Sequence, residues 1–200
     1  NDADAPEVEL TSSEVAGLYA NSDEDTPGNP AYYAKRWQDC LNRVTWKDTG
    51  LPRWNGADGG ERPTEGDGSG ENPYRIYTAE QFRWALKNQQ SCTLMNDLDL
   101  GGQDGRNWTG ISYTTAATID GAGHTVYNLS SYTNQRAGLI EWAGADNYGF
   151  VLKNLTVANA QVHVSDKYAA PLVAGMDGGI IDQCSVVDTL TWQEDGGSTP

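Results

Sequence analysis

Three aspartates have the clearest chemical potential in this 200-residue sequence. Asp97 and Asp99 flank a leucine, and Asp120 opens the segment DGAGH, which ends at His124. Two carboxyl groups at a suitable separation can act as general acid and general base, as in glycoside hydrolases. If the protein is an enzyme, Asp97, Asp99 and Asp120 are the candidate catalytic residues. The structural alternative is that they end a strand or begin a turn, with His124 capping that turn.

Tryptophan offers a second kind of chemistry, because exposed indole rings stack on sugar rings. Trp37 and Trp84 fall in segments that are predicted to be helical, where we expect them to pack. The four tryptophans in predicted turns are the candidate carbohydrate-binding residues: Trp54, Trp108, Trp142 and Trp192.

No metal site and no cofactor site is predicted. Cys40, Cys92 and Cys184 lack the zinc-site spacing of about two to four residues between paired ligands. Neither an HExxH motif nor a recognisable Ser, His, Asp motif occurs. The segment EGDGSGEN at 65–72 alternates carboxylates and glycines, but it lacks the downstream glutamate of an EF-hand, so we interpret it as a connector.

The composition narrows the class of partner. Thirteen basic and 28 acidic residues give a net charge of -15, which repels phosphate backbones and anionic lipid headgroups. Nucleic acid is therefore not an expected partner. No apolar run approaches the roughly 18 residues that a membrane span needs, so we expect no membrane insertion within this chain.

The secondary structure that the sequence predicts differs from one part of the chain to the next. Residues 1–54 read as an acidic leader followed by a helical cap, in which Tyr33, Trp37, Leu41 and Val44 recur at helical spacing. Residues 55–73 form a Gly-rich connector. A capping box at Thr78 and Gln81 then begins a short helix with Phe82, Ala85 and Leu86 on its buried face.

Residues 74–192 are predicted to form the main domain, and residues 193–200 read as a linker-like tail. From residue 92 onward the pattern is alternating, with short strands rich in β-branched residues between Gly, Asn and Asp turns. Several short strands without crossover helices leave a sandwich, a barrel or a solenoid.

An internal repeat favours the solenoid. The segments HTVYNLSS (124–131), FVLKNLTV (150–157) and GIIDQCSV (179–186) align without gaps. The alignment predicts stacked coils with Asn128, Asn154 and Gln183 in one column of amides, which bond to one another at a corner. A second predicted column, inside the coils, contains Leu129, Leu155 and Cys184. We therefore predict a mainly β fold: a right-handed parallel β-helix of about three or more coils with an N-terminal α-helical cap.

A disulfide between Cys40 and Cys92 is a hypothesis that follows from this arrangement. Cys40 lies on the apolar stripe of the N-terminal helix, and Cys92 follows the helix that opens the solenoid. If the first helix caps that end, the two residues approach the Cα separation of about 4.4 to 6.8 Å that a disulfide needs. A chain with three reduced thiols is the alternative.

Several sequence segments resemble segments of known surface proteins. The stretches GSGENPYRIYTAEQFRWALKN, LMNDLDLGG, NWTGI and TIDGAGHTVYNLS resemble the opening of β-solenoid regions in large bacterial cell-surface proteins. APLVAGMDGGIIDQCSV looks like the GLUG repeat of adhesins, which also occurs in the N-terminal region of IgA1-specific zinc metallopeptidases. The resemblance covers about residues 68 to 190, and it departs from the usual repeat at Pro171 and Met176.

The resemblance implies a secreted protein at the bacterial cell surface, in which this chain belongs to a larger parent. The leading hypothesis is a non-catalytic module for adhesion, or for display as a spacer, that binds a host protein or glycan. A polysaccharide-degrading β-helix enzyme, either a glycoside hydrolase or a lyase, is the first alternative. An accessory N-terminal region of a secreted metallopeptidase is the second.

Overall fold

The protein is described by a computed structural model, which covers residues 46–144 and 149–193. All paired strands of these residues run parallel. The first sheet contains, in order, β1 (Tyr74–Ile76), β2 (Cys92–Leu94), β5 (Ala117–Asp120), β10 (Phe150–Lys153) and β14 (Ile180–Asp182). The second contains β3 (Leu98–Asp99), β6 (Thr125–Tyr127), β11 (Thr156–Ala158) and β15 (Ser185–Val187).

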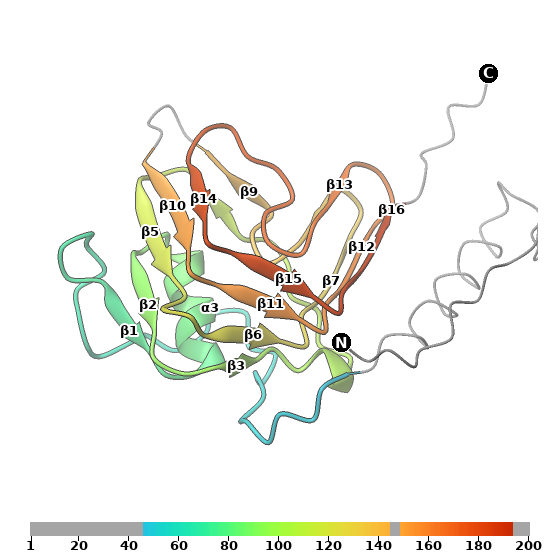
Figure 1. Cartoon of the computed structure of the whole chain (residues 1–200), viewed down its shortest axis with the longest axis horizontal. Helices are drawn as coiled ribbons and strands as arrows, with labels where there is room; N and C mark the ends of the chain where they lie inside the picture. The colour runs from blue at the N-terminus through green and yellow to red at the C-terminus, as the bar shows by residue number, and fades with distance from the viewer. Residues whose placement is uncertain (1–45, 145–148, 194–200) are drawn as a thin grey trace, which may run out of the picture. The chain divides into compact units, whose positions relative to one another are not determined.

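A third sheet completes each turn of the chain. It contains β7 (Ser130–Thr133), β12 (Gln161–Val164) and β16 (Leu190–Gln193). Two short pairs follow it along the turns: β8 (Arg136–Ala137) with β13 (Tyr168–Ala169), and β4 (Ser112–Tyr113) with β9 (Trp142–Ala143). The strands are thus stacked as a parallel β-solenoid with about three complete turns, as predicted (Figure 1).

Most turns bend at two corners where a residue with a side-chain amide or carboxylate has left-handed backbone; at the first corner of the β5–β6 turn, Ala122 and Gly123 take this conformation instead. Asn154 and Gln183 occupy the first corner, with φ of 51° and 50°. Asn128, Asn159 and Asp188 occupy the second, with φ of 57°, 52° and 49°. Asn and Asp tolerate this conformation better than other residues with a side chain, which explains their recurrence at both corners.

The observed strand pairing differs from the predicted register, and the similarity of the two corners explains the error. Strand β6 pairs with β11, so that Val126 stacks on Val157 and not on Leu152. Leu152 stacks on Ile119 and on Ile181 instead. The sequence alignment matched the second corner of one turn to the first corner of the next, because both are an Asn or Gln followed by a strand.

The predicted columns at the corners change accordingly. Asn154 and Gln183 do share a column, but Asn128 belongs to the other corner. Leu155 and Cys184 lie on adjacent turns, since the Ser185 amide donates to the Leu155 carbonyl. Leu129 lies at the second corner in line with Ala160, since its carbonyl accepts from the Gln161 amide of the next strand.

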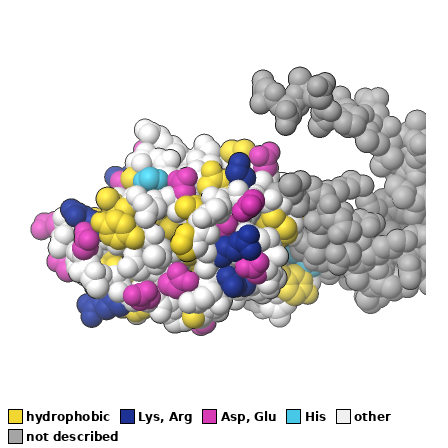
Figure 2. Space-filling view, turned by 90° about the horizontal axis from the view of Figure 1, so that it is seen from below, with side chains coloured by type: hydrophobic (Ala, Val, Ile, Leu, Met, Phe, Trp, Pro, Cys, Tyr) yellow, Lys and Arg dark blue, Asp and Glu magenta, His cyan; other side chains and the backbone are white. Residues whose placement is uncertain are grey.

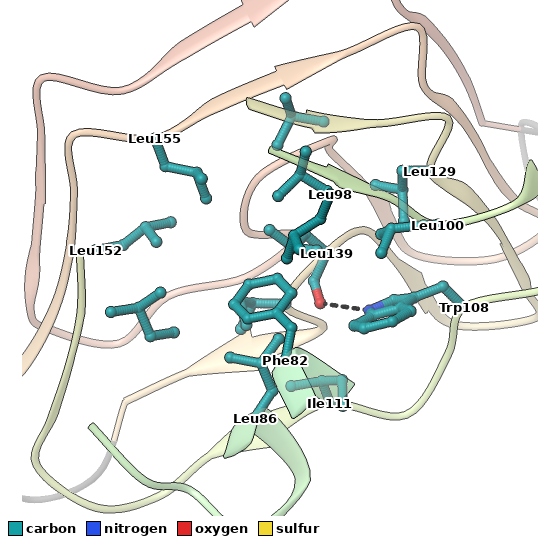
Figure 3. Close-up of a cluster of buried hydrophobic side chains, with 14 of the residues drawn as sticks. Phe82, Leu86, Leu98, Leu100, Trp108, Ile111, Leu129, Leu139, Leu152 and Leu155 are labelled. Carbon is teal, nitrogen blue, oxygen red and sulfur yellow. Dashed lines mark hydrogen bonds between the residues drawn. The ribbon is translucent and has the colours of Figure 1, made fainter. Parts of the chain in front are cut away.

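The interior of the solenoid is filled by the inward residues of the strands and by residues from the irregular segments. Figure 3 shows the leucines of successive turns pointing toward Phe82 and Trp108. The Trp108 indole N–H donates to the Leu139 carbonyl at 3.1 Å, so this buried ring has its one polar group satisfied.

Helix α3 (Ala79–Lys87) closes the end of the interior nearest β1 and β2. The Thr78 half of the predicted capping box is confirmed, because the Thr78 side chain accepts from the Gln81 amide. The Gln81 side chain accepts from the Tyr77 amide, one residue before the cap, instead of from the amide of Thr78. The predicted buried face is also confirmed, because Phe82, Ala85 and Leu86 are fully buried. The expected helical cap around Tyr33 to Val44 lies outside the described residues.

Residues 46–73 have little regular structure, which was expected only of the connector at 55–73, and both parts of this segment are hydrogen-bonded to the solenoid. Trp54 is buried, and Arg53 forms a parallel bridge with Asp99. Further along, the Gly68 carbonyl accepts from the Ser91 amide. The short 3-10 helix η1 (Gly102–Asp104) follows β3.

The opposite end of the solenoid is open within the described residues. Ile181 and Val186 continue the inward columns of Leu152 and Val157, yet they are 45% and 42% exposed. Strands β14, β15 and β16 each pair with a neighbour on one side only. The final turn therefore presents apolar side chains and unpaired strand edges together.

Candidate functional site

Asp99, a predicted catalytic candidate, is a structural residue. It is fully buried, and its Oδ1 accepts from the Gly101 amide at 2.9 Å. Its Oδ2 accepts from the Thr49 hydroxyl at 2.7 Å, from Asn128 Nδ2 at 2.9 Å and from Gln103 Nε2 at 3.2 Å. A carboxylate surrounded by donors and closed to solvent holds the segment around Thr49 on the solenoid, and it has no access to a substrate.

The predicted hydrogen bonds between stacked corner amides are wrong for Asn128, whose side chain bonds to other groups. Its Nδ2 donates to Asp99 and to the Lys47 carbonyl, and its Oδ1 accepts from the Lys47 amide at 2.9 Å. Asn154 Nδ2 similarly donates to Asp120 Oδ1 at 3.0 Å. In these two cases the corner amide bonds to a carboxylate of the preceding turn, because the turns carry Asp near the positions where later turns carry Asn.

Asp120 is also engaged. Its Oδ1 accepts from Asn154 and from the Ala122 amide, and its Oδ2 lies 3.2 Å from Lys153 Nζ. Burial acts to raise the pKa of Asp120, but the hydrogen bonds from Asn154, Ala122 and Lys153 outweigh it and hold the pKa below its ordinary value. The residue is therefore a stable carboxylate at neutral pH and is poorly suited to donate a proton.

Asp97 is the candidate that faces solvent. Its Oδ1 accepts from the Thr125 amide at 2.9 Å and lies 3.1 Å from His124 Nδ1. The two side chains are 41% and 35% exposed. Neither Asp97 Oδ2 nor His124 Nε2 has a hydrogen-bond partner among the described residues. This pair leaves one acceptor and one imidazole nitrogen available.

The Asp97–His124 pair lines a groove of about 520 Å³. Its apolar wall contains Leu51, Pro52, Ala79 and Leu98. Tyr77, which is 39% exposed, also lines it. Asn96 adds an amide, whose Nδ2 donates to the Tyr77 carbonyl at 3.1 Å.

A second hollow of about 450 Å³ lies at the first corner. Asp120, Asn154 and Gln183 line it, together with Gly123, which directly precedes His124. The two hollows follow successive turns, which are spaced by about 4.8 Å in a parallel sheet. The second hollow is lined mainly by polar side chains, whereas the first has an apolar wall.

The tryptophan prediction is wrong for Trp54 and Trp108. Their side chains are 2% and 1% exposed, and their rings meet edge to face at 5.1 Å. The buried Arg83 guanidinium lies 4.6 Å from the Trp108 ring and 5.5 Å from the Trp54 ring. Turn position did not imply exposure, because a side chain of α3 meets both rings from elsewhere in the sequence.

Trp142 and Trp192 remain less constrained. Trp142 is half-buried, with the Arg136 guanidinium 4.6 Å from its ring. The backbone of Trp192 belongs to β16, where it pairs with His163, and its side chain lies outside what the structure describes. A carbohydrate-binding role for either residue stays a prediction.

The cysteine hypothesis is untested, because Cys40 lies outside the described residues. Cys92 is fully buried, and the pKa of its thiol is raised by burial, and to a lesser extent by Asp120, to about 12. Cys184 is half-buried, and burial raises its pKa as well. No group of three His, Cys, Asp or Glu side chains within the described ranges is arranged to hold a metal ion.

Sequence reasoning missed Tyr77 and Asn96 as groove residues. The signal was available in the separation of Asp97 and His124, which is 27 residues and close to one turn of the solenoid. Tyr77 was identified only as part of the helix start. Its place beside Asn96 depends on the parallel pairing of β1 with β2.

Comparison with known proteins gives no relative: no protein-family model, no curated protein and no solved structure matches this chain. Among the helices in the described part of the chain, none is both long and apolar enough to cross a membrane.

Proposed function

We propose that this chain is a non-catalytic module of a secreted bacterial surface protein, which serves in adhesion or display and binds a host protein or glycan. The observation that carries this proposal is that two of the three candidate catalytic aspartates are engaged in structural hydrogen bonds and an ion pair. Asp99 is buried among donors, and Asp120 is paired with Lys153 and held ionised. Asp99 and Asp120 thus make structural contacts at the corners, while Asp97 lines a groove together with His124.

The form of the molecule also supports this proposal. A stack of parallel turns is a stiff support that presents its corner side chains in rows. Figure 2 shows acidic and basic side chains interspersed with hydrophobic ones on one face, without a continuous basic surface. This distribution and the net charge of -15 favour a protein or sugar partner over a nucleic acid.

Binding of the purified chain to arrays of glycans and host extracellular proteins tests this proposal. We expect saturable binding to one class of surface, with no turnover of the bound material. Binding to no glycan and to no protein would contradict it.

A polysaccharide-degrading enzyme is the second candidate, and the Asp97–His124 pair is the observation in its favour. A carboxylate that orients an imidazole can support proton transfer. Release of reducing ends or unsaturated products from polysaccharides, abolished by Asp97→Asn in a folded protein, would establish this alternative. The third candidate, an accessory region of a secreted metallopeptidase, is tested by the sequence that follows this chain in its parent gene.

A further inference from the structure

We propose that the groove at Tyr77, Asp97 and His124 binds a neutral sugar of a glycan, through ring stacking and paired hydroxyl contacts. This inference rests on the proposed binding function and assigns it a site and a ligand class. Three side chains that line the groove are accessible to a ligand: Tyr77 is 39% exposed, Asp97 is 41% exposed and His124 is 35% exposed.

The groove combines two surfaces that a pyranose ring requires. Leu51, Pro52 and Leu98 provide apolar wall, and Tyr77 provides an aromatic ring, which suits the C–H face of a sugar. Asp97 Oδ2 and His124 Nε2 are without hydrogen-bond partners among the described residues. A carboxylate accepts strong hydrogen bonds from hydroxyl groups, and an imidazole can donate or accept beside it.

The pair is also held in place before a ligand arrives. The Thr125 amide donates to Asp97 Oδ1, which is 3.1 Å from His124 Nδ1. The carboxylate and the ring therefore restrain each other through Asp97 Oδ1 and His124 Nδ1, and both side chains line the groove. Preorganised polar groups of this kind lower the ordering cost of binding.

The backbone around the groove argues against a peptide strand as the ligand. The Met95 amide donates to the Ile76 carbonyl, and the Thr156 amide donates to the His124 carbonyl. Successive turns thus use each other's main-chain groups at this corner. Strand addition needs an open sheet edge, so the ligand here must be recognised through side chains.

Charge selects among sugars. A bound uronate or sialate would place its carboxylate near Asp97, in a protein whose net charge is -15. Like charges in a partly enclosed groove repel, whereas the hydroxyl groups of a neutral sugar donate to the same carboxylate. The groove volume of about 520 Å³ suits one or two sugar rings. The second hollow, at Asp120, Asn154 and Gln183, offers further polar side chains to a longer glycan.

The test is titration calorimetry of the full chain with cellotriose, maltotriose and mannotriose as neutral probes and trigalacturonate as the acidic probe. We expect at least one neutral trisaccharide to bind more tightly than trigalacturonate. Tyr77→Ala and Asp97→Asn should each weaken that binding by about tenfold or more. Tyr132→Ala removes a 52% exposed tyrosine from β7, away from the groove, and is the matched control.

Circular dichroism and thermal melting confirm that each variant is folded; Asp97→Asn retains an acceptor for the Thr125 amide. Failure of all three neutral probes to bind, equal or tighter binding of trigalacturonate, or unchanged binding in folded Tyr77→Ala and Asp97→Asn would overturn the inference. In each case the proposed function survives if the wild-type chain still binds a glycan or protein on the arrays. It fails separately if the arrays show no binding.

Discussion

At the scale of single residues, close approach between turns dictates which side chains are allowed. Gly121 lies beneath the first corner of the next turn. A Cβ added to it would lie 2.4 Å from the Asn154 carbonyl oxygen and 2.6 Å from the Leu155 Cα. The backbone on both sides is fixed by the parallel ladder, so neither atom can move away easily.

Gly121→Ala should therefore destabilise the fold by about 1–3 kcal/mol, the usual cost of overpacking a rigid interior. Gly59→Ala is the control, because its added Cβ meets no atom within 4 Å and its φ is not positive. That change should be neutral or slightly stabilising. Urea unfolding measures both; equal stability of the two variants would contradict the close packing at the first corner.

Asp120 gives a prediction for the dependence of stability on pH. Its pKa is lower in the folded chain than the ordinary value of 3.8, so it stabilises the fold above that value. The contribution disappears as the pH falls through the lower pKa of the folded state. Asp120→Asn should thus cost stability at neutral pH, and the difference from wild type should shrink in acid below about pH 3.8.

The free energy of unfolding in urea, measured from neutral pH into the acid range, checks this prediction. Asp166→Asn, at an exposed site, should leave the difference from wild type small throughout. A difference for Asp120→Asn that stays constant through the acid range would show that folding does not lower the pKa of Asp120.

The cysteines differ in accessibility. Cys92 is fully buried with a pKa of about 12, whereas Cys184 is half-buried. Iodoacetamide should label Cys184 before Cys92 in the native protein, because the thiolate is the reactive form. Mass spectrometry after non-reducing denaturation and alkylation decides the Cys40–Cys92 hypothesis. Labelling of Cys184 alone supports the disulfide, and labelling of all three cysteines ends it.

At the scale of elements, helix α3 is the part that turns an open stack of strands into a closed interior. Its Thr78 cap satisfies one of the free amides of the first turn, and Arg83 donates to the Thr109 carbonyl at 2.6 Å from within the core. The same guanidinium pairs with Asp58, whose pKa is lowered by the hydrogen bonds from Lys87 and Arg83. The helix thereby joins the connector to the solenoid.

Thr78→Ala should lower the free energy of unfolding by about 1 kcal/mol, because the Gln81 amide loses its partner. Thr64→Ala, at an exposed site in the connector, should change it very little. Thermal unfolding of both variants provides the comparison. Equal midpoints would indicate that the start of α3 is held by its buried face alone.

The elements also show what the sequence could predict and where it failed. Alternation around Leu152 and the capping box at Thr78 are local patterns, and both were predicted. The pairing of Val126 with Val157 was missed, because two corners with the same chemistry offered two alignments. The burial of Trp108 was missed because it depends on α3, and the groove at Asp97 depends on the register of several turns.

At the scale of the whole molecule, the two ends of the solenoid differ: among residues 46–144 and 149–193, helix α3 covers one end and no element covers the other. Leu152 and Ile181 occupy the same column, but they are 0% and 45% exposed. A residue's contribution to stability therefore depends on its turn as well as on its column.

Leu152→Ala should cost about 2–5 kcal/mol, and Ile181→Ala should cost much less, because its side chain is already partly in water. Amide hydrogen exchange should show the same gradient, with β14, β15 and β16 exchanging before β5 and β10. Urea unfolding and exchange monitored by mass spectrometry give the two readouts. Equal losses in the two variants would mean that the last turn is covered in solution.

The closure by α3 also imposes an order in time. A ribosome releases the amino-terminal part of a chain first, so the helix and β2 are available before the later turns are made. Each subsequent turn can then pair with the exposed strand edges of the preceding turn and pack on its apolar side chains. The solenoid therefore extends in one direction, away from α3. At each stage of synthesis the last folded turn serves as the template for the next one, so the exposed strand edge moves forward one turn at a time.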